Sequence, residues 1–225
     1  MTPSTPSHSL PRLRQALGEE TRTALIDAAT RVFIDEGFRA ARVQTIAECA
    51  GTRLSAINYH FGGKEGLYRA VLQHHAELAI RHTPLPSPGA DNPREALAEA
   101  IRMIVRRFLD PATKSSIGQL MLRELMNPTA ALQAMIARFS LPQSQLFRPL
   151  VKAVLGAKAS DEMIDRAMIS IFSQCMGYVT ARPLIEQISP SSLAGEDMVE
   201  RVTAHIATFS WGGLMALRAS LEETT

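Results

Sequence analysis

The sequence predicts an all-α protein, in which an N-terminal three-helix domain with a helix-turn-helix precedes a larger helical domain. Apolar residues recur at helical spacing along most of the 225 residues. No stretch shows sustained alternation of apolar and polar residues bounded by hairpin turns, so no strand is predicted. With 46% hydrophobic and 20% charged residues, the chain is apolar enough to bury a sizeable core.

The N-terminal elements are predicted as a flexible tail and four helices. Residues 1–20 contain three prolines among serines and threonines, a composition typical of a flexible terminus. A helix is expected over 21–36, because its apolar residues fall on one face and Gly37 follows where a helix stop belongs. Further helices are predicted over 43–50, 54–61 and 64–82.

The remaining elements are all helices separated by helix breakers. Residues 83–93 are rich in proline and predict a loop. Leu141-Pro142 and the segment 183–190 are likewise predicted breaks. Apolar periodicity predicts helices over 97–108, 117–126, 130–139, 146–155, 161–181 and 196–221.

The segment VQTIAECAGTRLSAINYHFGGK, residues 43–64, predicts a helix-turn-helix. Gly51 supplies a tight turn, and the small side chains of Ala47 and Ala50 allow the two short helices to cross closely. The second helix projects polar groups of the kind that meet phosphates or base edges. These are Arg53, Ser55, Asn58, Tyr59 and His60.

Residues 21–72 resemble the DNA-binding domain of TetR-family transcriptional regulators. The matching positions are Phe33, Gly37, Phe38, Thr45, Ile46, Ala47, Ala50, Gly51, AINYHF at 56–61, Lys64, Glu65 and Leu67. The resemblance implies a homodimer that places two recognition helices in successive major grooves of a roughly palindromic operator in double-stranded DNA.

The resemblance also assigns roles to single residues. Tyr59, His60 and Lys64 match the family's phosphate clamp, and Thr45 matches a hydroxyl that meets the DNA backbone. Positions that face bases or their flank are occupied by Arg53, Leu54, Ser55 and Asn58, and Arg42 adds to the local positive charge.

Two residues depart from the family pattern at the start of the recognition helix. The family usually has Val or Ile where Thr52 stands, and a short capping Ser or Asn where Arg53 stands. Thr52 is placed among the candidate DNA-binding residues, and we hypothesise that it caps the helix, which frees Arg53 to contact either guanine or phosphate.

Residues 73–225 are implied by the same resemblance to form an effector-binding and dimerisation domain. RELMNPT at 123–129 is similar to a segment of the CecR-like subgroup. Dimerisation is expected through 161–181 and 196–221, where Gly177, Gly212 and Gly213 predict close helix approach. An adaptable, largely apolar pocket for an unidentified small molecule is predicted. Its candidate residues are Phe108, Met121, Arg123, Glu124, Phe139, Phe172, Gln174 and Met176, each of which has ordinary packing as the alternative.

The predicted function is that of a ligand-responsive dimeric regulator, a repressor released from its operator by the effector, with activation as the open alternative. A second candidate is an apolar-ligand binding protein whose helix-turn-helix is vestigial. An enzyme is not predicted, because no nucleophile and base pair, Walker loop, dinucleotide turn, cofactor motif or metal-ligand spacing is present.

The overall charge indicates how many phosphates the protein contacts, and the cysteines indicate the cellular compartment. The net charge is only +2, so few phosphate contacts per subunit are expected, made by a local basic face. Cys49 and Cys175 lie far apart in sequence, which argues against a disulfide framework or a structural zinc site and favours the cytoplasm. No apolar run is long enough to span a membrane, so no membrane partner is expected.

Overall fold

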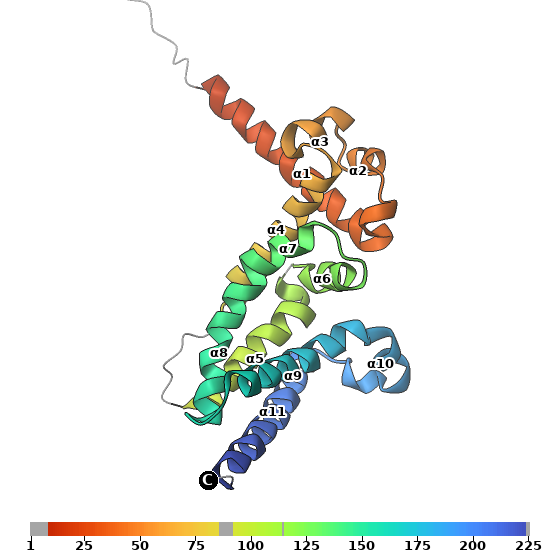
Figure 1. Cartoon of the computed structure of the whole chain (residues 1–225). Helices are drawn as coiled ribbons and strands as arrows, with labels where there is room; N and C mark the ends of the chain where they lie inside the picture. The colour runs from red at the N-terminus through yellow and green to blue at the C-terminus, as the bar shows by residue number, and fades with distance from the viewer. Residues whose placement is uncertain (1–8, 86–91, 114, 224–225) are drawn as a thin grey trace, which may run out of the picture. The chain divides into compact units, whose positions relative to one another are not determined.

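The computed structural model describes residues 9–85, 92–113 and 115–223, with side chains from Gln15 onward except that of Pro111. These residues form helices joined by short connections, and the all-α prediction is confirmed (Figure 1). Contacts between Cα atoms divide the chain into two units, residues 1–74 and 75–225.

The N-terminal unit packs three helices and the start of a fourth around one core. Its helices are α1 (Ser9–Ala40), α2 (Val43–Cys49), α3 (Leu54–Phe61) and the first part of α4 (Lys64–His82). Each helix contributes fully buried apolar side chains, namely Leu25, Ile26, Phe33, Ile46, Ile57 and Leu67. Burial of one such side chain contributes about 1.5–3 kcal/mol, so the core holds even the short α2 and α3 in place.

The first helix begins earlier than predicted. Helix α1 starts at Ser9, whereas residues 1–20 were predicted to be a flexible tail; residues 1–8 lie outside the described part. Proline is tolerated in the first turn of a helix, where its missing N–H has no intrahelical partner. Most side chains over 15–20 are exposed, so they extend α1 without adding to the core.

Aromatic packing joins the end of α1 to α4. The rings of Phe33 and Tyr68 meet edge to face with centroids 4.7 Å apart, and Phe38 lies 4.9 Å from Tyr68. The guanidinium of Arg22, on α1, lies 5.6 Å from the ring centroid of Phe61 at the end of α3. These contacts position the helix-turn-helix against α1.

The C-terminal unit contains the second part of α4 and the remaining helices. They are α5 (Pro93–Leu109), η1 (Pro111–Thr113), α6 (Ile117–Met126), α7 (Ala131–Met135), η2 (Ile136–Ser140), α8 (Leu141–Leu155), α9 (Asp161–Thr180), α10 (Arg182–Ile188), η3 (Pro190–Ser192) and α11 (Met198–Glu223). Capping fixes two of the starts. The side chain of Asn92 accepts from the backbone N–H of Arg94, and that of Ser160 from Met163.

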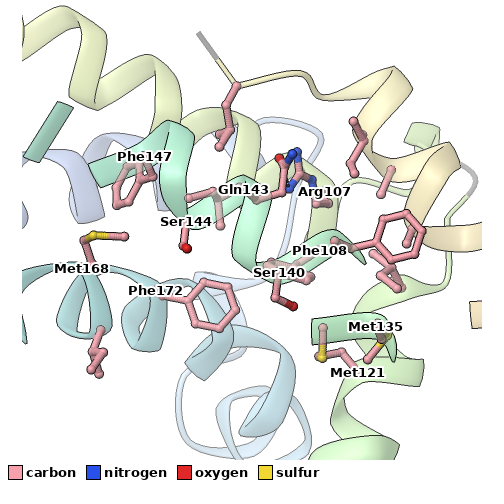
Figure 2. Close-up of a pocket in the computed structure, with 18 residues that line it drawn as sticks. Arg107, Phe108, Met121, Met135, Ser140, Gln143, Ser144, Phe147, Met168 and Phe172 are labelled. Carbon is pink, nitrogen blue, oxygen red and sulfur yellow. Dashed lines mark hydrogen bonds between the residues drawn. The ribbon is translucent and has the colours of Figure 1, made fainter. Parts of the chain in front are cut away.

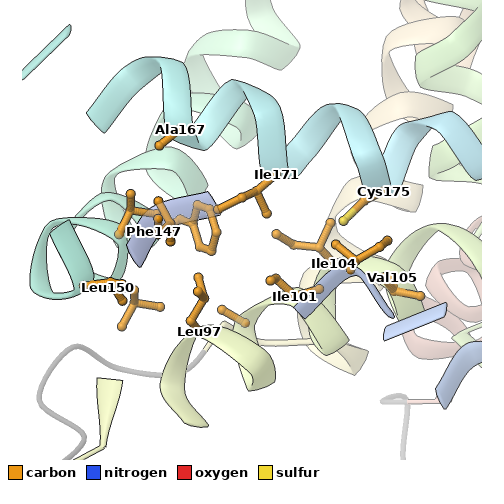
Figure 3. Close-up of a cluster of buried hydrophobic side chains, with 14 of the residues drawn as sticks. Leu97, Ile101, Ile104, Val105, Phe147, Leu150, Ala167, Ile171 and Cys175 are labelled. Atoms are coloured by element: carbon orange, nitrogen blue, oxygen red, sulfur yellow. The ribbon is translucent and has the colours of Figure 1, made fainter. Parts of the chain in front are cut away.

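The core of this unit lies between α5, α8, α9 and α11 (Figure 3). Leu97 and Ile101 of α5, Phe147 of α8 and Ile171 of α9 are buried there. Cys175 packs in the same cluster as a free cysteine, and burial raises the pKa of its thiol to about 12. It therefore stays protonated at neutral pH and behaves as a small apolar side chain.

Two predicted breaks are helical. Leu141-Pro142 does not separate two helices, because α7, the π-helical turn η2 and α8 follow one another without interruption. The segment 183–190 was predicted to be a break but contains most of α10. Pro183 stands in the first turn of α10, where proline starts a helix rather than ending one, whereas Pro142 directly follows the π-helical turn inside the continuous α7–η2–α8 segment.

The predicted close approach at glycines is not made within the chain. A Cβ added at Gly177, Gly212 or Gly213 would meet nothing within 4 Å. The two glycines of α11 are exposed, and Phe209, one turn earlier, is 65% exposed. None of the described helices combines the length and apolar character needed to cross a bilayer.

Candidate functional site

The turn between α2 and α3 is tight, and the backbone N–H groups of Gly51 and Thr52 are hydrogen-bonded to α2. Gly51 has φ 63°, a conformation that glycine adopts without strain, and its N–H donates to Glu48 O at 3.0 Å. The N–H of Thr52 donates to Ala47 O at 2.9 Å. At the other end of α3, Gly62 closes the helix at φ 72° and donates to Asn58 O at 2.9 Å.

The outward face of α3 carries the predicted DNA contacts. Ile57 is buried, whereas exposed side chains occupy two successive turns on the other side of the helix. These are Leu54, Ser55, Asn58 and Tyr59. Tyr59 is 85% exposed, so its large ring contributes almost nothing to the folded core. Half-buried His60 lies against it, with ring centroids 4.9 Å apart.

The other predicted DNA contacts flank α3. Arg42 and Arg53 are exposed at the N-terminal ends of α2 and α3, and Thr45 is half-buried on α2. Lys64 has a structural role as well, because its Nζ donates to Arg39 O at 3.1 Å and lies 5.0 Å from the ring centroid of Phe38. An ammonium group has three N–H donors, so Lys64 can hold the end of α1 and still contact a phosphate.

The capping hypothesis for Thr52 is wrong. Arg53, not Thr52, occupies the N-cap position of α3, and no side chain caps this helix. The Oγ1 atom of Thr52 is buried and has no hydrogen-bond partner among the described residues. Thr52 stands one residue too early, because a capping oxygen accepts from N–H groups two or three residues after the N-cap.

We expect Thr52→Val to stabilise the protein by about 1 kcal/mol, since valine has the same shape and removes an unsatisfied hydroxyl. Urea unfolding followed by circular dichroism measures this change. A loss of stability of that size would show instead that the hydroxyl is satisfied in solution. Operator affinity should not change, because the hydroxyl is turned away from solvent.

An apolar cavity of about 330 Å³ lies within the C-terminal unit (Figure 2). Its volume falls in the range of small-molecule sites. Its walls come from α4, α5, α6, the continuous α7–η2–α8 segment and α9. The lining residues are Ala76, Ala79, Ile80, Leu85, Ile104, Arg107, Phe108, Ile117, Met121, Met135, Phe139, Ser140, Gln143, Ser144, Phe147, Met168, Ile169 and Phe172.

The structure separates the predicted ligand residues into two groups. Phe108, Met121, Phe139 and Phe172 line the cavity, and the rings of Phe108 and Phe172 meet edge to face at 5.8 Å. The other four, Arg123, Glu124, Gln174 and Met176, do not line it.

Polar partners explain why two of these residues are placed elsewhere. The buried carboxylate of Glu124 accepts from the N–H and the hydroxyl of Thr129, which holds the turn after α6. The amide of Gln174 donates to Ser210 Oγ of α11 at 3.2 Å. Arg123 is half-buried on α6, and Met176 is buried on α9.

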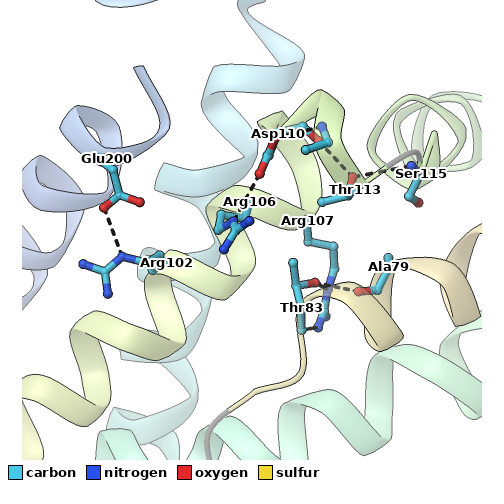
Figure 4. Close-up of polar contacts among 10 residues, drawn as sticks. Ala79, Thr83, Arg102, Arg106, Arg107, Asp110, Thr113, Ser115 and Glu200 are labelled. Carbon is cyan, nitrogen blue, oxygen red and sulfur yellow. Dashed lines mark hydrogen bonds and ion pairs between the residues drawn. The ribbon is translucent and has the colours of Figure 1, made fainter. Parts of the chain in front are cut away.

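Sequence reasoning missed the polar group that stands out in the cavity wall, Arg107. Its Nε donates to Thr83 Oγ1 at 3.1 Å, its Nη2 to Thr83 O at 2.6 Å and its Nη1 to Gln143 Oε1 at 3.1 Å (Figure 4 shows the Thr83 contacts). Burial lowers the pKa of Arg107 to about 10, so it remains charged at neutral pH. The available signal was its place between Ile104 and Phe108 on the apolar face of a predicted helix.

The π-helical turn η2 aligns one wall of the cavity. Met135, Phe139, Gln143 and Phe147 follow one another at a spacing of four and all line it. In an α-helix this spacing drifts by about 40° per step around the axis. The wider π turn over Ile136–Ser140 offsets that drift, so the side chains keep facing the cavity.

Comparison with known families covers both units. Residues 25–71 match the family described as "Bacterial regulatory proteins, tetR family". Residues 93–214 match "HTH-type transcriptional dual regulator CecR, C-terminal domain".

Individual relatives agree with these family matches. The dual regulator CecR of Shigella flexneri is 31% identical over 155 residues, which are 64% of this chain and 69% of the relative. The transcriptional activator FasR of Mycolicibacterium smegmatis is 31% identical over 199 residues, 87% and 84% of the two chains. The solved structure of PfmR from Thermus thermophilus shares the fold, with a TM-score of 0.61 at 16% identity over 83% and 96% of the chains. The chain therefore belongs to the TetR family of transcriptional regulators, with a C-terminal domain of the CecR type.

Proposed function

We propose that the protein is a homodimeric repressor that a small molecule releases from its operator. The outward face of α3 supports the DNA-binding part of this proposal, because it presents an 85%-exposed tyrosine beside exposed amide and hydroxyl groups. Such groups add little to the fold but are suited to phosphate and base contacts. Repression requires only occupancy of the operator, whereas activation requires a further contact with the transcription machinery.

Helices α9 and α11 form the proposed dimer interface. The exposed glycines of α11 and the exposed ring of Phe209, which stacks on His205, place small and apolar groups on the surface of this helix. Small residues permit close helix approach, and an apolar surface gains stability when a second copy covers it. Sedimentation at micromolar concentration should show a dimer, and a monomer there would contradict this interface.

Helix α4 provides the proposed route from ligand to DNA. It begins at Lys64, directly after the recognition helix α3, and its later residues Ala76, Ala79 and Ile80 line the cavity. A ligand that favours one placement of this helix changes the affinity for DNA, and DNA must change the ligand affinity by the same factor.

The test is a mobility shift with the DNA upstream of the protein's own gene, across a salt series and with candidate ligands. Sequence preference and a steep fall of affinity with salt support a regulator. Absence of DNA binding with retained ligand binding would favour the second candidate, a ligand-binding protein with a vestigial helix-turn-helix. In vitro transcription distinguishes repression from activation.

Arg53 is proposed to read a guanine, because residues at the N-terminus of a recognition helix reach base edges and its side chain is exposed there. We expect Arg53→Ala to remove discrimination at one base pair in each half-site, by about 1–3 kcal/mol. Binding to a panel of single-base operator variants measures this. Equal weakening on every variant, with a shallower salt dependence, would assign Arg53 to a phosphate instead.

A further inference from the structure

We propose that the cavity binds an apolar molecule carrying one carboxylate, with the carboxylate held by Arg107. This inference rests on the proposed function, because it names the chemical class of the effector. Most of the eighteen side chains that line the cavity are apolar, and Arg107 is the single charged group among them. Figure 2 shows its guanidinium beside the Gln143 side chain.

Among the described residues, the hydrogen bonds of Arg107 use only part of its donors. A guanidinium has five N–H donors, and three of them reach Thr83 Oγ1, Thr83 O and Gln143 Oε1. One N–H on each terminal nitrogen therefore has no acceptor in this part of the chain. Two such donors in the plane of a guanidinium suit the two oxygens of a carboxylate.

The charge of Arg107 is also uncompensated. Across the described parts of the chain, no Asp or Glu forms an ion pair with it, although the neighbouring Arg106 pairs with Asp110 at 3.1 Å. All its observed partners are neutral oxygens. A cation removed from water is costly unless an anion accompanies it, so an anionic ligand gains more at this site than a neutral ligand of equal size.

The apolar lining of the cavity indicates the other part of the ligand. The rings of Phe108, Phe139, Phe147 and Phe172 and the flexible side chains of Met121 and Met168 offer an apolar volume beside the cation. A molecule with an apolar body and one terminal carboxylate matches both parts. The alternative is that Arg107 is only a structural link from Thr83 to Gln143. The experiment must distinguish this structural role from carboxylate binding.

The experiment is isothermal titration calorimetry on the full chain without DNA, using decanoate against decanol and naphthoate against naphthol. The carboxylate of each pair should bind roughly ten- to a hundredfold more tightly than its alcohol, as expected for charge-assisted hydrogen bonds. Gln143→Glu places a carboxylate on an existing partner of Arg107 and should abolish this preference while alcohol binding persists. Arg107→Met should do the same if it folds. Gln145→Glu, an exposed change two residues away and outside the cavity, is the matched control and should keep the preference.

The outcomes separate this inference from the proposed function. Equal or weaker binding of both carboxylates, absence of carboxylate binding, or an unchanged preference in Gln143→Glu would overturn the inference and leave Arg107 as a structural link. Carboxylate binding that never alters operator affinity would support the inference but contradict effector release. Release from DNA by an uncharged ligand, with no carboxylate bound, would support effector release but contradict the inference about Arg107.

Discussion

Gly66→Ala is expected to destabilise the N-terminal unit by about 3 kcal/mol, the upper end for overpacking. A Cβ at Gly66 would lie 1.7 Å from the carbonyl oxygen of Phe61 and 2.9 Å from its carbonyl carbon. These are backbone atoms at the end of α3, so no side-chain rotation relieves the overlap. The chain between α3 and α4 must move instead, and the recognition helix moves with it.

Thermal unfolding of the N-terminal unit should show a midpoint lower by roughly 10–20 °C. Hydrogen exchange should show faster exchange of the amides over 54–61. Gly18→Ala is the matched control, because it lies in helix α1 with nothing within 4 Å of an added Cβ, and it should stabilise by about 0.5–1 kcal/mol. Wild-type stability in Gly66→Ala would show that the close approach between Gly66 and Phe61 is absent in solution.

Tyr59→Phe is expected to weaken operator binding roughly a hundredfold while the fold is unchanged. In the proposed complex the Tyr59 hydroxyl donates to a charged phosphate, a contact that contributes about 1.5 kcal/mol, and the proposed dimer loses it twice. The ring is 85% exposed, so the variant should unfold within about 0.5 kcal/mol of the wild type. Fluorescence anisotropy with labelled operator measures the affinity.

Further measurements test whether the Tyr59 hydroxyl itself makes the DNA contact. A neutral hydroxyl releases no counterion, so the salt dependence of binding should stay the same in Tyr59→Phe, unlike the variants that remove a charge. Met126→Ala, which alters another strongly exposed apolar side chain in the C-terminal unit, should bind operator normally. Full affinity in Tyr59→Phe with a loss only in Tyr59→Ala would assign the contact to the ring rather than to the hydroxyl.

Helices with a clear apolar stripe were predictable from the sequence. Leu25, Val32 and Ile46 fall at helical spacing in the sequence, and the structure buries all three. The errors occur where proline is present. Proline ends a helix from inside but starts one from its first turn, and local composition does not distinguish these positions. Pro11 and Pro183 lie in the first turns of α1 and α10, and Pro142 follows the π-helical turn within a continuous helical segment.

The ligand site was less predictable because side chains reach it from distant segments. Phe108 and Phe172 meet although 64 residues of numbering separate them, and periodicity within one helix does not reveal such a pairing. Glu124 looked like a ligand group because it is charged in an apolar segment, but a local turn satisfies it. Arg107 was overlooked for the opposite reason, since arginines on surface helices are common and only its distant partners distinguish it.

The π-helical turn over Ile136–Ser140 gives this family member a route to new specificity through length rather than substitution. A π hydrogen-bonded loop holds one residue more than an α loop, so deleting one residue there, such as the exposed Ala137, leaves an ordinary α-helix. The two flanking helices then keep nearly the same rotation relative to each other, because the wide turn had absorbed the extra residue. Losing one codon at this point therefore changes only the part of the cavity wall that the turn itself contributes, which includes Phe139 and Ser140, while both flanking helices keep their buried faces.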